Sequence, residues 1–483
     1  MSDVNAVHTV GSIEMGGEAT GRVETWAQRE PRLLREEVEM EGVRMVVTIA
    51  GDDAWLTDNN GAVRSLSGAE RASALLTHEL LFHDYLDGET PPFALTVEEQ
   101  RIRFVPPDGS SEPVLELATD ASTGAFLPVS WTERQQGMTV VTRFTDWRTV
   151  DGVRIPYTST QSTGDPRFDL VRRTDTLILL EALGEGAVPI PEVGRHVDAF
   201  VTDPELARAI PIELMQNLVV VDVSVDGETG RFLLDTGAGS TIVSRAFAER
   251  LGLAEKGRIE ARGAGGNETA AFVEVGSLTV PGIELRDQTL VTLPLDALAG
   301  ALERPIDGIL GYDFLSRFTV EIDYVEKRLA LGEPGGYVPR EGAVRVPLTI
   351  EANIPRIPGR VGDLPAGLFI LDTGNSRSVF LHGPFVKKHA LGDLLETVAS
   401  RVSGIGGHQE ILEARVPSLT VGDVPFTDVP VAYSTADSGV LAIDEAIGNL
   451  GGALFAHGVL AVDYSEGSLW FSPMPTAERA SRR

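Results

Sequence analysis

Phe232-Leu-Leu-Asp-Thr-Gly-Ala-Gly-Ser-Thr241 is the stretch that decides the fold of the second half of this chain. Its apolar start predicts a buried strand, and its glycine-rich continuation predicts a tight turn that leaves the strand. The strand therefore delivers one carboxylate, Asp235, to the beginning of a turn. The pattern returns at Leu368-Phe-Ile-Leu-Asp-Thr-Gly-Asn-Ser-Arg-Ser378, with Asp372 in the place of Asp235. The offset, 372 − 235 = 137 residues, is about the size of one small domain.

Two copies of one Asp-Thr-Gly motif indicate a pair of carboxylates that work together. Two carboxyl groups about 3 Å apart cannot both ionise, so they share one proton. The ionised member then acts as a base toward water, and the protonated member acts as an acid toward a carbonyl oxygen. The alternative is a pair of ordinary strand-to-turn corners, because Asp and Gly are common turn residues. Two matching motifs inside a longer repeat favour the carboxylate pair.

The longer repeat surrounds both motifs. Each motif is followed by a predicted helix, at 244–251 or 383–390, and then by a glycine-rich tip. Each copy later carries a Leu-Gly element, Asp307-Gly-Ile-Leu-Gly-Tyr312 or Ile447-Gly-Asn-Leu-Gly-Gly452, which we interpret as a structural support of the core. A repeat of this length predicts two similar units, each unable to build the site alone. The units can pair within one chain or between two chains, and the sequence leaves this open.

With these motifs, residues 205–475 resemble the aspartic proteases, in the form of a single chain that holds two lobes of retropepsin type. The resemblance implies that Asp235 and Asp372 are catalytic and that the two motif threonines bond across a pseudo-twofold axis. It also implies a set of residues that support the active site and two substrate-binding flaps at the glycine-rich tips. The supporting residues are Thr236, Gly237, Ser240, Thr373, Gly374 and Asn375, and the flap residues are Gly263, Ala264, Gly265, Gly266, Gly404, Ile405, Gly406 and Gly407.

The sequence departs from the pepsin-like pattern in several places. No Tyr stands near Gly263–Gly266, where pepsin-like enzymes carry one on the flap, and the large insertions of pepsin-like lobes are absent. The residue after the motif is Ala238 in one copy and Asn375 in the other, so the two loops differ chemically. By position alone, Ser240 is the hydroxyl partner of Asp235. The glycine tips also fit plain hairpin turns, but glycine lets backbone amides approach a substrate closely, which favours flaps.

Residues 1–190 lack the motif and show strand-like alternation instead. Residues 10–182 resemble the periplasmic lipoprotein-carrier superfamily in their order of glycines, charged strands and closing strand pair. This resemblance implies an open, curved antiparallel sheet with a helix, and a lipid or lipoprotein as partner; the alternative is a β-rich accessory or pro-domain. The predicted strands are 21–26, 44–49, 101–105 and 138–144, the predicted helix is 68–86, and a Gly- and Pro-rich linker follows at 184–191. His78 and His83 are spaced too poorly on one helix face to favour a metal site over packing or surface roles.

Composition limits the partners. With 71 acidic and 41 basic residues the chain carries a net charge of −30, which disfavours nucleic acid and anionic membranes as partners. The absence of cysteine excludes disulfides, thiolate metal sites and thiol catalysis. The sequence shows no signal peptide and no transmembrane segment. We nevertheless expect an exported protein, periplasmic or extracellular, that needs no cofactor or metal because a carboxylate pair and water suffice.

These observations predict a mainly β protein with an N-terminal β-rich domain and linker (1–190) and two protease β-barrel lobes (191–340 and 341–483). The predicted function is an aspartic endopeptidase in which Asp235 and Asp372 activate a water in the cleft between the lobes. We expect a mildly acidic optimum of roughly pH 4 to 6. One alternative is a catalytically weak or inactive protein that binds peptide or lipid on the same scaffold. Another is a lipid or lipoprotein carrier whose lobes act on its cargo or serve as a dimer platform.

Overall fold

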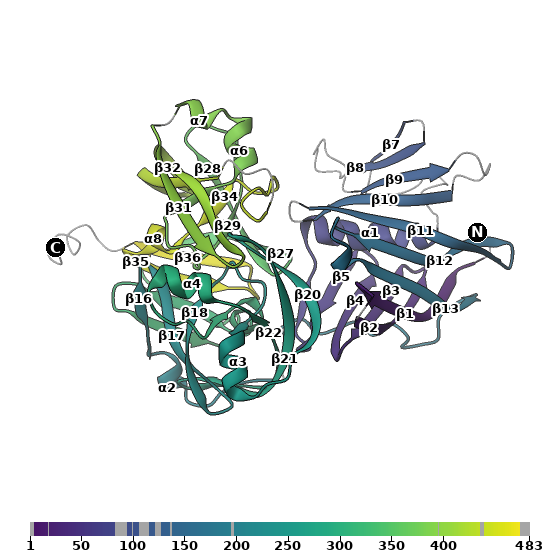
Figure 1. Ribbon diagram of the computed structural model, residues 1–483, viewed down its shortest axis with the longest axis horizontal. Coiled ribbons are helices and arrows are strands. Elements are labelled where there is room, and N and C mark those ends of the chain that lie inside the picture. Colours follow the sequence, from purple (N-terminus) through teal and green to yellow (C-terminus); the bar gives the residue numbers. More distant parts are fainter. Residues whose placement is uncertain are drawn as a thin grey trace. The chain divides into compact units, whose positions relative to one another are not determined.

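The chain is mainly β and divides into two compact units, residues 1–195 (unit 1) and residues 196–483 (unit 2) (Figure 1). The structure is a computed structural model, and each unit is described by itself. The structure describes residues 4–17, 19–82, 94–98, 100–105, 115–120, 127–135, 138–194, 198–394, 396–434 and 439–473. His83 and the last residues of the predicted helix, 83–86, lie outside these residues.

Unit 1 is an open antiparallel sheet. Strands that follow each other in the chain pair with each other, except β6 and β7. Its first and last strands, β1 and β13, pair with each other in the middle of the sheet, and its edges are β6 and β7. Tight hairpin turns such as Asp151-Gly152, both at positive φ, join the strands. The strands are β1 (Ala6–Met15), β2 (Ala19–Gln28), β3 (Leu33–Met40), β4 (Val43–Ala50), β5 (Asp53–Thr57), β6 (Val63–Ser65), β7 (Ala94–Glu98), β8 (Arg101–Val105), β9 (Leu115–Asp120), β10 (Leu127–Gln135), β11 (Met138–Val150), β12 (Val153–Ser162) and β13 (Leu170–Leu180), with a 3-10 turn at Pro166–Phe168.

The helix α1 (Gly68–Phe82) joins the two halves of this sheet. Leu75 and Phe82 pack into a core with strands β1 to β5, whereas Leu76 and Leu80 pack into a second core with strands β8 and β9. His78 is buried on the same helix, and its Nε2 lies 2.8 Å from the backbone oxygen of Gln28. This is the packing role that the spacing favours.

Unit 2 contains two lobes with matching sheets, which we call lobe 1 (198–340) and lobe 2 (341–473). The strand order of lobe 1 is β14-β22-β19-β23-β18-β17-β21-β20, with β16 paired to β17, and that of lobe 2 is β27-β28-β29-β34-β30-β33-β32-β31. The lobe 1 strands are β14 (Ala199–Val201), β16 (Glu213–Met215), β17 (Leu218–Val225), β18 (Glu228–Leu234), β19 (Ile242–Ser244), β20 (Lys256–Gly263), β21 (Gly266–Val280), β22 (Ile283–Leu293) and β23 (Gly308–Leu310). The lobe 2 strands are β27 (Thr349–Glu351), β28 (Ile354–Val361), β29 (Gly367–Leu371), β30 (Val379–Leu381), β31 (Val398–Gly404), β32 (Gly407–Val421), β33 (Val424–Tyr433) and β34 (Gly448–Leu450).

Short helices complete the lobes. The predicted helix after the first motif is α3, which begins after Ser244, whose Oγ accepts from the Phe247 amide at 3.1 Å, and ends at Gly252 with φ 69°. Its counterpart in lobe 2 is α6, shorter than predicted. The helices are α2 (Pro204–Ala207), α3 (Arg245–Leu251), α4 (Asp296–Leu302), α5 (Tyr312–Leu315), α6 (Gly383–Lys388), α7 (Leu391–Leu394) and α8 (Gly452–Phe455).

A six-stranded sheet joins the lobes, with three strands from each. Its order is β15-β25-β24-β35-β36-β26, and the lobes meet where β24 pairs antiparallel with β35. The two lobes therefore pair within one chain, which the sequence left open. The strands are β15 (Ile210–Pro211), β24 (Thr319–Asp323), β25 (Arg328–Gly332), β26 (Val344–Pro347), β35 (Gly458–Asp463) and β36 (Ser468–Pro473).

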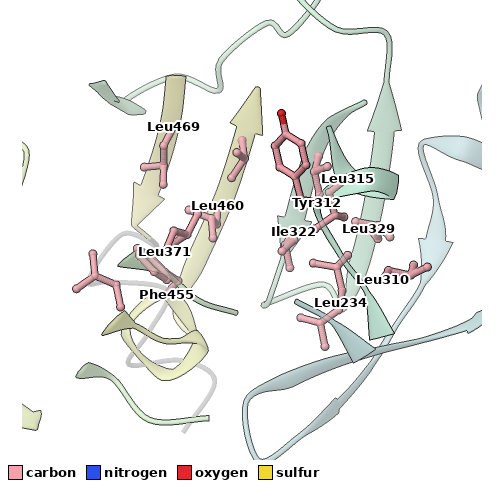
Figure 2. Close-up of a cluster of buried hydrophobic side chains, with 14 of the residues drawn as sticks. Leu234, Leu310, Tyr312, Leu315, Ile322, Leu329, Leu371, Phe455, Leu460 and Leu469 are labelled. Carbon is pink, nitrogen blue, oxygen red and sulfur yellow. The ribbon is translucent and has the colours of Figure 1, made fainter. Parts of the chain in front are cut away.

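One hydrophobic core runs through both lobes beneath the two motifs. Leu234 and Leu371, each directly before a motif Asp, are fully buried in it, together with Ile322, Leu329 and Leu460 of the joining sheet (Figure 2). Burial of each such side chain stabilises the fold by about 1.5–3 kcal/mol. One shared hydrophobic core therefore holds in place the two strands that carry the carboxylates.

Candidate active site

The structure brings Asp235 and Asp372 together. Each Asp follows an inner strand, and its amide donates to the backbone oxygen of the neighbouring Leu-Gly element, at 3.0 Å to Leu310 and at 2.9 Å to Leu450. Each carboxyl lies against the motif loop of the other lobe, because the Gly374 amide donates to Asp235 Oδ1 at 3.2 Å and the charge of Asp235 contributes to raising the pKa of Asp372. Both Asp residues are only half-buried, so the pair remains accessible to water.

The two motif threonines bond reciprocally across the pseudo-twofold axis. Thr236 Oγ1 donates to the Leu371 oxygen at 2.9 Å and accepts from the Thr373 amide at 3.0 Å. Thr373 Oγ1 donates to the Leu234 oxygen at 2.9 Å and accepts from the Thr236 amide at 3.0 Å. Both threonines are buried, so these four hydrogen bonds replace water that the loops have lost. The predicted cross-axis contact is present.

We expect Thr236→Val to lower the free energy of unfolding of unit 2 by about 2–4 kcal/mol, because it leaves one buried oxygen and one buried amide without partners. Valine keeps the shape, so little of the loss comes from packing. Chemical denaturation followed by fluorescence measures the change. Thr229→Val is the control, because Thr229 is exposed on β18 and its change should stay within about 0.5 kcal/mol. Equal stability of the two variants would contradict this role.

The surroundings of the two carboxyl groups differ. Asp235 Oδ1 accepts two backbone hydrogen bonds, from Gly237 at 2.8 Å and from Gly374 at 3.2 Å. Burial raises the pKa of Asp235, and these two amides oppose that rise because they stabilise the anion. Burial, and to a lesser degree the charge of Asp235, raise the pKa of Asp372 to about 8. The geometry therefore favours Asp235 as the ionised member and Asp372 as the protonated member.

Two residues that the sequence did not single out contact the Asp372 side. The amide of Asn449, on β34, has its Nδ2 2.6 Å from Asp372 Oδ2 and its Oδ1 2.7 Å from His382 Nε2. The other ring nitrogen of His382, Nδ1, lies 3.0 Å from the Ile443 oxygen. Our interpretation of both Leu-Gly elements as structural supports is therefore incomplete, because in lobe 2 this element reaches the Asp372 carboxyl. The residue of lobe 1 that corresponds to Asn449 is Ile309, because the two occupy the same register in their sheets. The apolar side chain of Ile309 cannot hydrogen-bond to a carboxyl group.

Two asparagines brace the loops that follow the motifs. Asn217, in the turn before β17, donates to the Ser376 oxygen in lobe 2 at 3.3 Å. Asn353, in the matching turn before β28, donates to the Gly239 oxygen in lobe 1 at 3.2 Å. Both asparagines have positive φ, 69° and 63°, which Asn tolerates better than most residues. Their offset of 353 − 217 = 136 residues, close to that of the motifs, was a signal in the sequence.

Two predicted supporting residues act differently from expectation. Within the described part of the chain, no hydrogen bond joins the Ser240 hydroxyl to Asp235; the Ser240 backbone instead lies where a side chain on Gly311 would clash. Asn375 Oδ1 accepts from the Arg377 amide at 3.1 Å, and its backbone oxygen accepts from Gly452 at 2.9 Å. Asn375 thus shapes the turn after the second motif, and its side chain forms no hydrogen bond with the carboxyl groups.

The two glycine-rich tips meet each other. They close the long hairpins β20–β21 and β31–β32 (Figure 1), and the Gly265 amide donates to the Ile405 oxygen at 2.9 Å. A Cβ on Gly265 would lie 2.3 Å from the Gly407 nitrogen, and one on Gly406 would lie 2.5 Å from the Gly266 oxygen, so glycine is required for this approach. Ile405 packs on a lobe 1 core and Ala264 on a lobe 2 core. Each tip therefore crosses to the opposite lobe; Gly263 and Gly404 end the strands that carry them.

The described residues contain no cluster of three or more His, Cys, Asp or Glu side chains able to hold a metal ion. Of the helices that the structure describes, none has the length and apolarity to cross a membrane.

Comparisons with known proteins find a family model and solved structures that are similar to parts of this chain. A family model described as "Aspartyl protease" matches residues 221–314 and residues 357–451, one segment in each lobe. Among solved structures, the aspartic proteinase from Irpex lacteus has 14% sequence identity and a TM-score of 0.36, covering 55% of this chain and 96% of that chain. No curated protein matches. The family matches lie in unit 2, so the resemblance of unit 1 to lipoprotein carriers stays a prediction. Two segments of the chain, one in each lobe, are therefore similar to the aspartyl protease family.

Proposed function

We propose that unit 2 is an aspartic endopeptidase that hydrolyses peptide bonds in protein or peptide substrates. The observation that carries this proposal is the close approach of Asp235 and Asp372, held by reciprocal threonine bonds across the lobes. A carboxyl pair of this kind supplies a base and an acid in one site without any other group.

In the proposed reaction, Asp235 acts as base and Asp372 as acid. The Asp235 carboxylate takes a proton from a water as that water attacks the scissile carbonyl carbon. Asp372 gives its proton to the carbonyl oxygen, which yields a neutral tetrahedral diol. The proton on Asp235 then passes to the leaving nitrogen while Asp372 recovers one from the diol, so the starting state returns. The glycine tips supply backbone amides and carbonyls that pair with an extended substrate once they separate.

A peptidase assay on the full chain tests this proposal. We expect cleavage of an unstructured protein such as oxidised insulin B chain, with inhibition by pepstatin, which mimics the tetrahedral diol. Binding of pepstatin without cleavage would instead support the alternative, a peptide-binding protein that has kept the lobes but not the rate. Absence of both would overturn the proposal. Location outside the cytoplasm stays a prediction that cell fractionation tests.

The rate of peptide cleavage should follow a bell-shaped pH profile. The alkaline limb of this profile should lie at a higher pH than expected from the sequence, which predicts an optimum of roughly pH 4 to 6. Asp372 must hold its proton, and burial and the charge of Asp235 raise its pKa to about 8, so activity should persist to neutral pH and fall as the pH rises through that value. The acid limb follows protonation of Asp235, whose pKa burial also raises. Measurement of kcat/KM from about pH 3 to about pH 10 gives both limbs. A rate that still rises above about pH 9 would indicate a different base.

We also propose that unit 1 binds an apolar ligand, such as a lipid chain. A cavity of about 230 Å³ lies inside the unit and is lined largely by apolar side chains of the sheet and α1, among them Val7, Leu80, Trp131, Phe144 and Leu177. Its volume lies below the roughly 300–1,000 Å³ of sites for drug-sized ligands, which suits one short apolar chain. Of the charged residues at its wall, Arg172 pairs with Glu36 at 2.8 Å and Arg173 pairs with Glu14 at 2.8 Å.

Native mass spectrometry of the purified full chain tests the lipid proposal. We expect a bound lipid that organic extraction releases, and weaker binding of a fluorescent fatty acid by Leu177→Trp, which fills the cavity. Ile178→Trp is the matched control, because Ile178 is exposed on the same strand. Equal affinity of the wild type and the Leu177 variant would remove the cavity as the binding site.

A further inference from the structure

A chain of three side chains leads from the buried core of lobe 2 to the carboxyl pair. It runs from the Ile443 oxygen to His382 Nδ1, from His382 Nε2 to the Asn449 amide, and from that amide to Asp372 Oδ2, at 3.0, 2.7 and 2.6 Å. His382 has no exposed surface. At these separations every neighbouring pair of atoms needs one donor and one acceptor.

The end of the chain at Ile443 fixes the histidine tautomer. Nδ1 lies 3.0 Å from the backbone oxygen of Ile443, and a backbone oxygen can only accept, so Nδ1 must carry a hydrogen. The charged side chain near the ring is Arg356 on β28, whose cation opposes a second positive charge, while Asp444 and Glu445 of the neighbouring loop are exposed. Burial, and to a lesser degree Arg356, lower the pKa of His382 to about 4. The ring is therefore neutral near pH 7, and its Nε2 is an acceptor.

The amide of Asn449 links this tautomer to the carboxyl. Rotation of the amide by half a turn exchanges its nitrogen and oxygen at nearly the same positions. With the oxygen toward His382, both ring nitrogens must donate, so the ring must be an imidazolium ion, and Asp372 Oδ2 accepts a hydrogen from the amide. With the nitrogen toward His382, the ring is neutral and the amide oxygen faces Asp372 Oδ2, so that oxygen must carry a hydrogen. The neutral buried ring selects the second state.

We propose that His382 and Asn449 are positioning residues that hold the shared proton of the pair on Asp372 Oδ2, which leaves Asp235 as the carboxylate that activates water. The proposal rests on the proposed function for its catalytic consequence, but not for the proton positions themselves. When the substrate takes this proton, the Asn449 amide turns to donate to the new carboxylate. The amide oxygen of Asn449 then faces the lone pair of His382 Nε2. Because both atoms are acceptors, this arrangement is unfavourable and favours the return of the proton to Asp372.

In lobe 1, the residues at the positions of His382 and Asn449 do not form an equivalent pair beside Asp235. Ile309 stands at the position of Asn449, and Ser244, which caps α3, stands at that of His382. Asp235 is instead surrounded by donors, the Gly237 and Gly374 amides, which favour its anion. Asp372 thus has a side-chain amide linked to a buried histidine beside it, whereas Asp235 has only backbone amides, and this difference gives the pair a direction.

The tautomer of His382 is measured directly by two-bond ¹H–¹⁵N correlation spectra of the full chain labelled in histidine nitrogen. At pH 7 we expect His382 to carry its hydrogen on Nδ1, with Nε2 unprotonated. His78 is an internal control, because it is also buried and its Nε2 faces the Gln28 oxygen, so it must show the opposite tautomer. His382→Ser, which copies lobe 1, assigns the signal by its loss. A hydrogen on Nε2 of His382, alone or with Nδ1, would overturn the proposal.

A second measurement follows Asp372 itself. Without His382, Asn449 is free to donate to Asp372, which favours the anion, so His382→Ser should move the alkaline limb of the rate profile to lower pH by about one unit. His457→Ser is the control, because His457 is exposed, and it should leave the limb unchanged. An unchanged or raised limb in His382→Ser would contradict the proposal. If the wild type cleaves no peptide, the proposed function fails, while the histidine spectra and a ¹³C titration of the Asp372 carboxyl still test the proton position.

Discussion

Asp235→Asn and Asp372→Asn should each lower kcat for peptide cleavage by a factor on the order of 10⁴ or more, because neither remaining carboxyl can supply both the base and the acid. Asn keeps the shape of Asp and can still accept from the Gly237 and Gly374 amides or contact Asn449. The fold should therefore survive. Since burial disfavours the charge of this pair, the thermal midpoint of either variant should be unchanged or higher.

Matched measurements separate loss of chemistry from loss of structure. Asp363→Asn makes the same chemical change at an exposed position of lobe 2 and should keep the parent rate. Pepstatin should still bind the Asp235 and Asp372 variants, although more weakly, because the lobes and tips remain. Cleavage at the parent rate by either of these two variants would exclude the shared-proton mechanism.

The centre of the site was predictable from sequence because the repeat is local. Each motif follows an apolar strand, and the strand ends with the same buried leucine, Leu234 or Leu371, so each Asp emerges at the same place in each lobe. The threonine contacts follow from that symmetry. The pairing of the lobes through β24 and β35 was not predictable, because two short apolar strands specify no partner by pattern alone.

The residues around the centre were harder to predict because tertiary register places them. Asn449 lies 77 positions after Asp372 and reaches it only because β34 pairs in parallel with β29, which sets Leu450 beside Leu371. His382 was missed for the same reason. The difference between Asn449 and Ile309 was nevertheless visible within two otherwise matching elements. A polar residue that replaces an apolar one in a predicted buried strand indicates a partner, and that partner is here the carboxyl.

Gly374→Ala should abolish most of the activity without removing any functional group. A Cβ at Gly374 would lie 2.3 Å from Asp235 Oδ2 and 2.6 Å from its Oδ1, far inside contact distance, so the carboxyl or the loop must move. A displacement of about 1 Å costs on the order of 10²-fold in rate, and such overpacking also lowers stability by about 1–3 kcal/mol. Measurement of kcat and of unfolding by denaturant gives both effects.

The matching change in lobe 1 makes this prediction specific to the geometry. A Cβ at Gly237 would lie 2.8 Å from Asp372 Oδ1, a smaller overlap, so Gly237→Ala should lose less activity than Gly374→Ala. Gly300→Ala is the control, because no atom lies within 4 Å of a Cβ there and the residue is exposed on helix α4. It should keep the parent rate and gain up to about 1 kcal/mol from the better helix propensity of alanine. A rate for Gly374→Ala equal to that of Gly300→Ala would mean that the two motif loops do not approach as closely as this geometry requires.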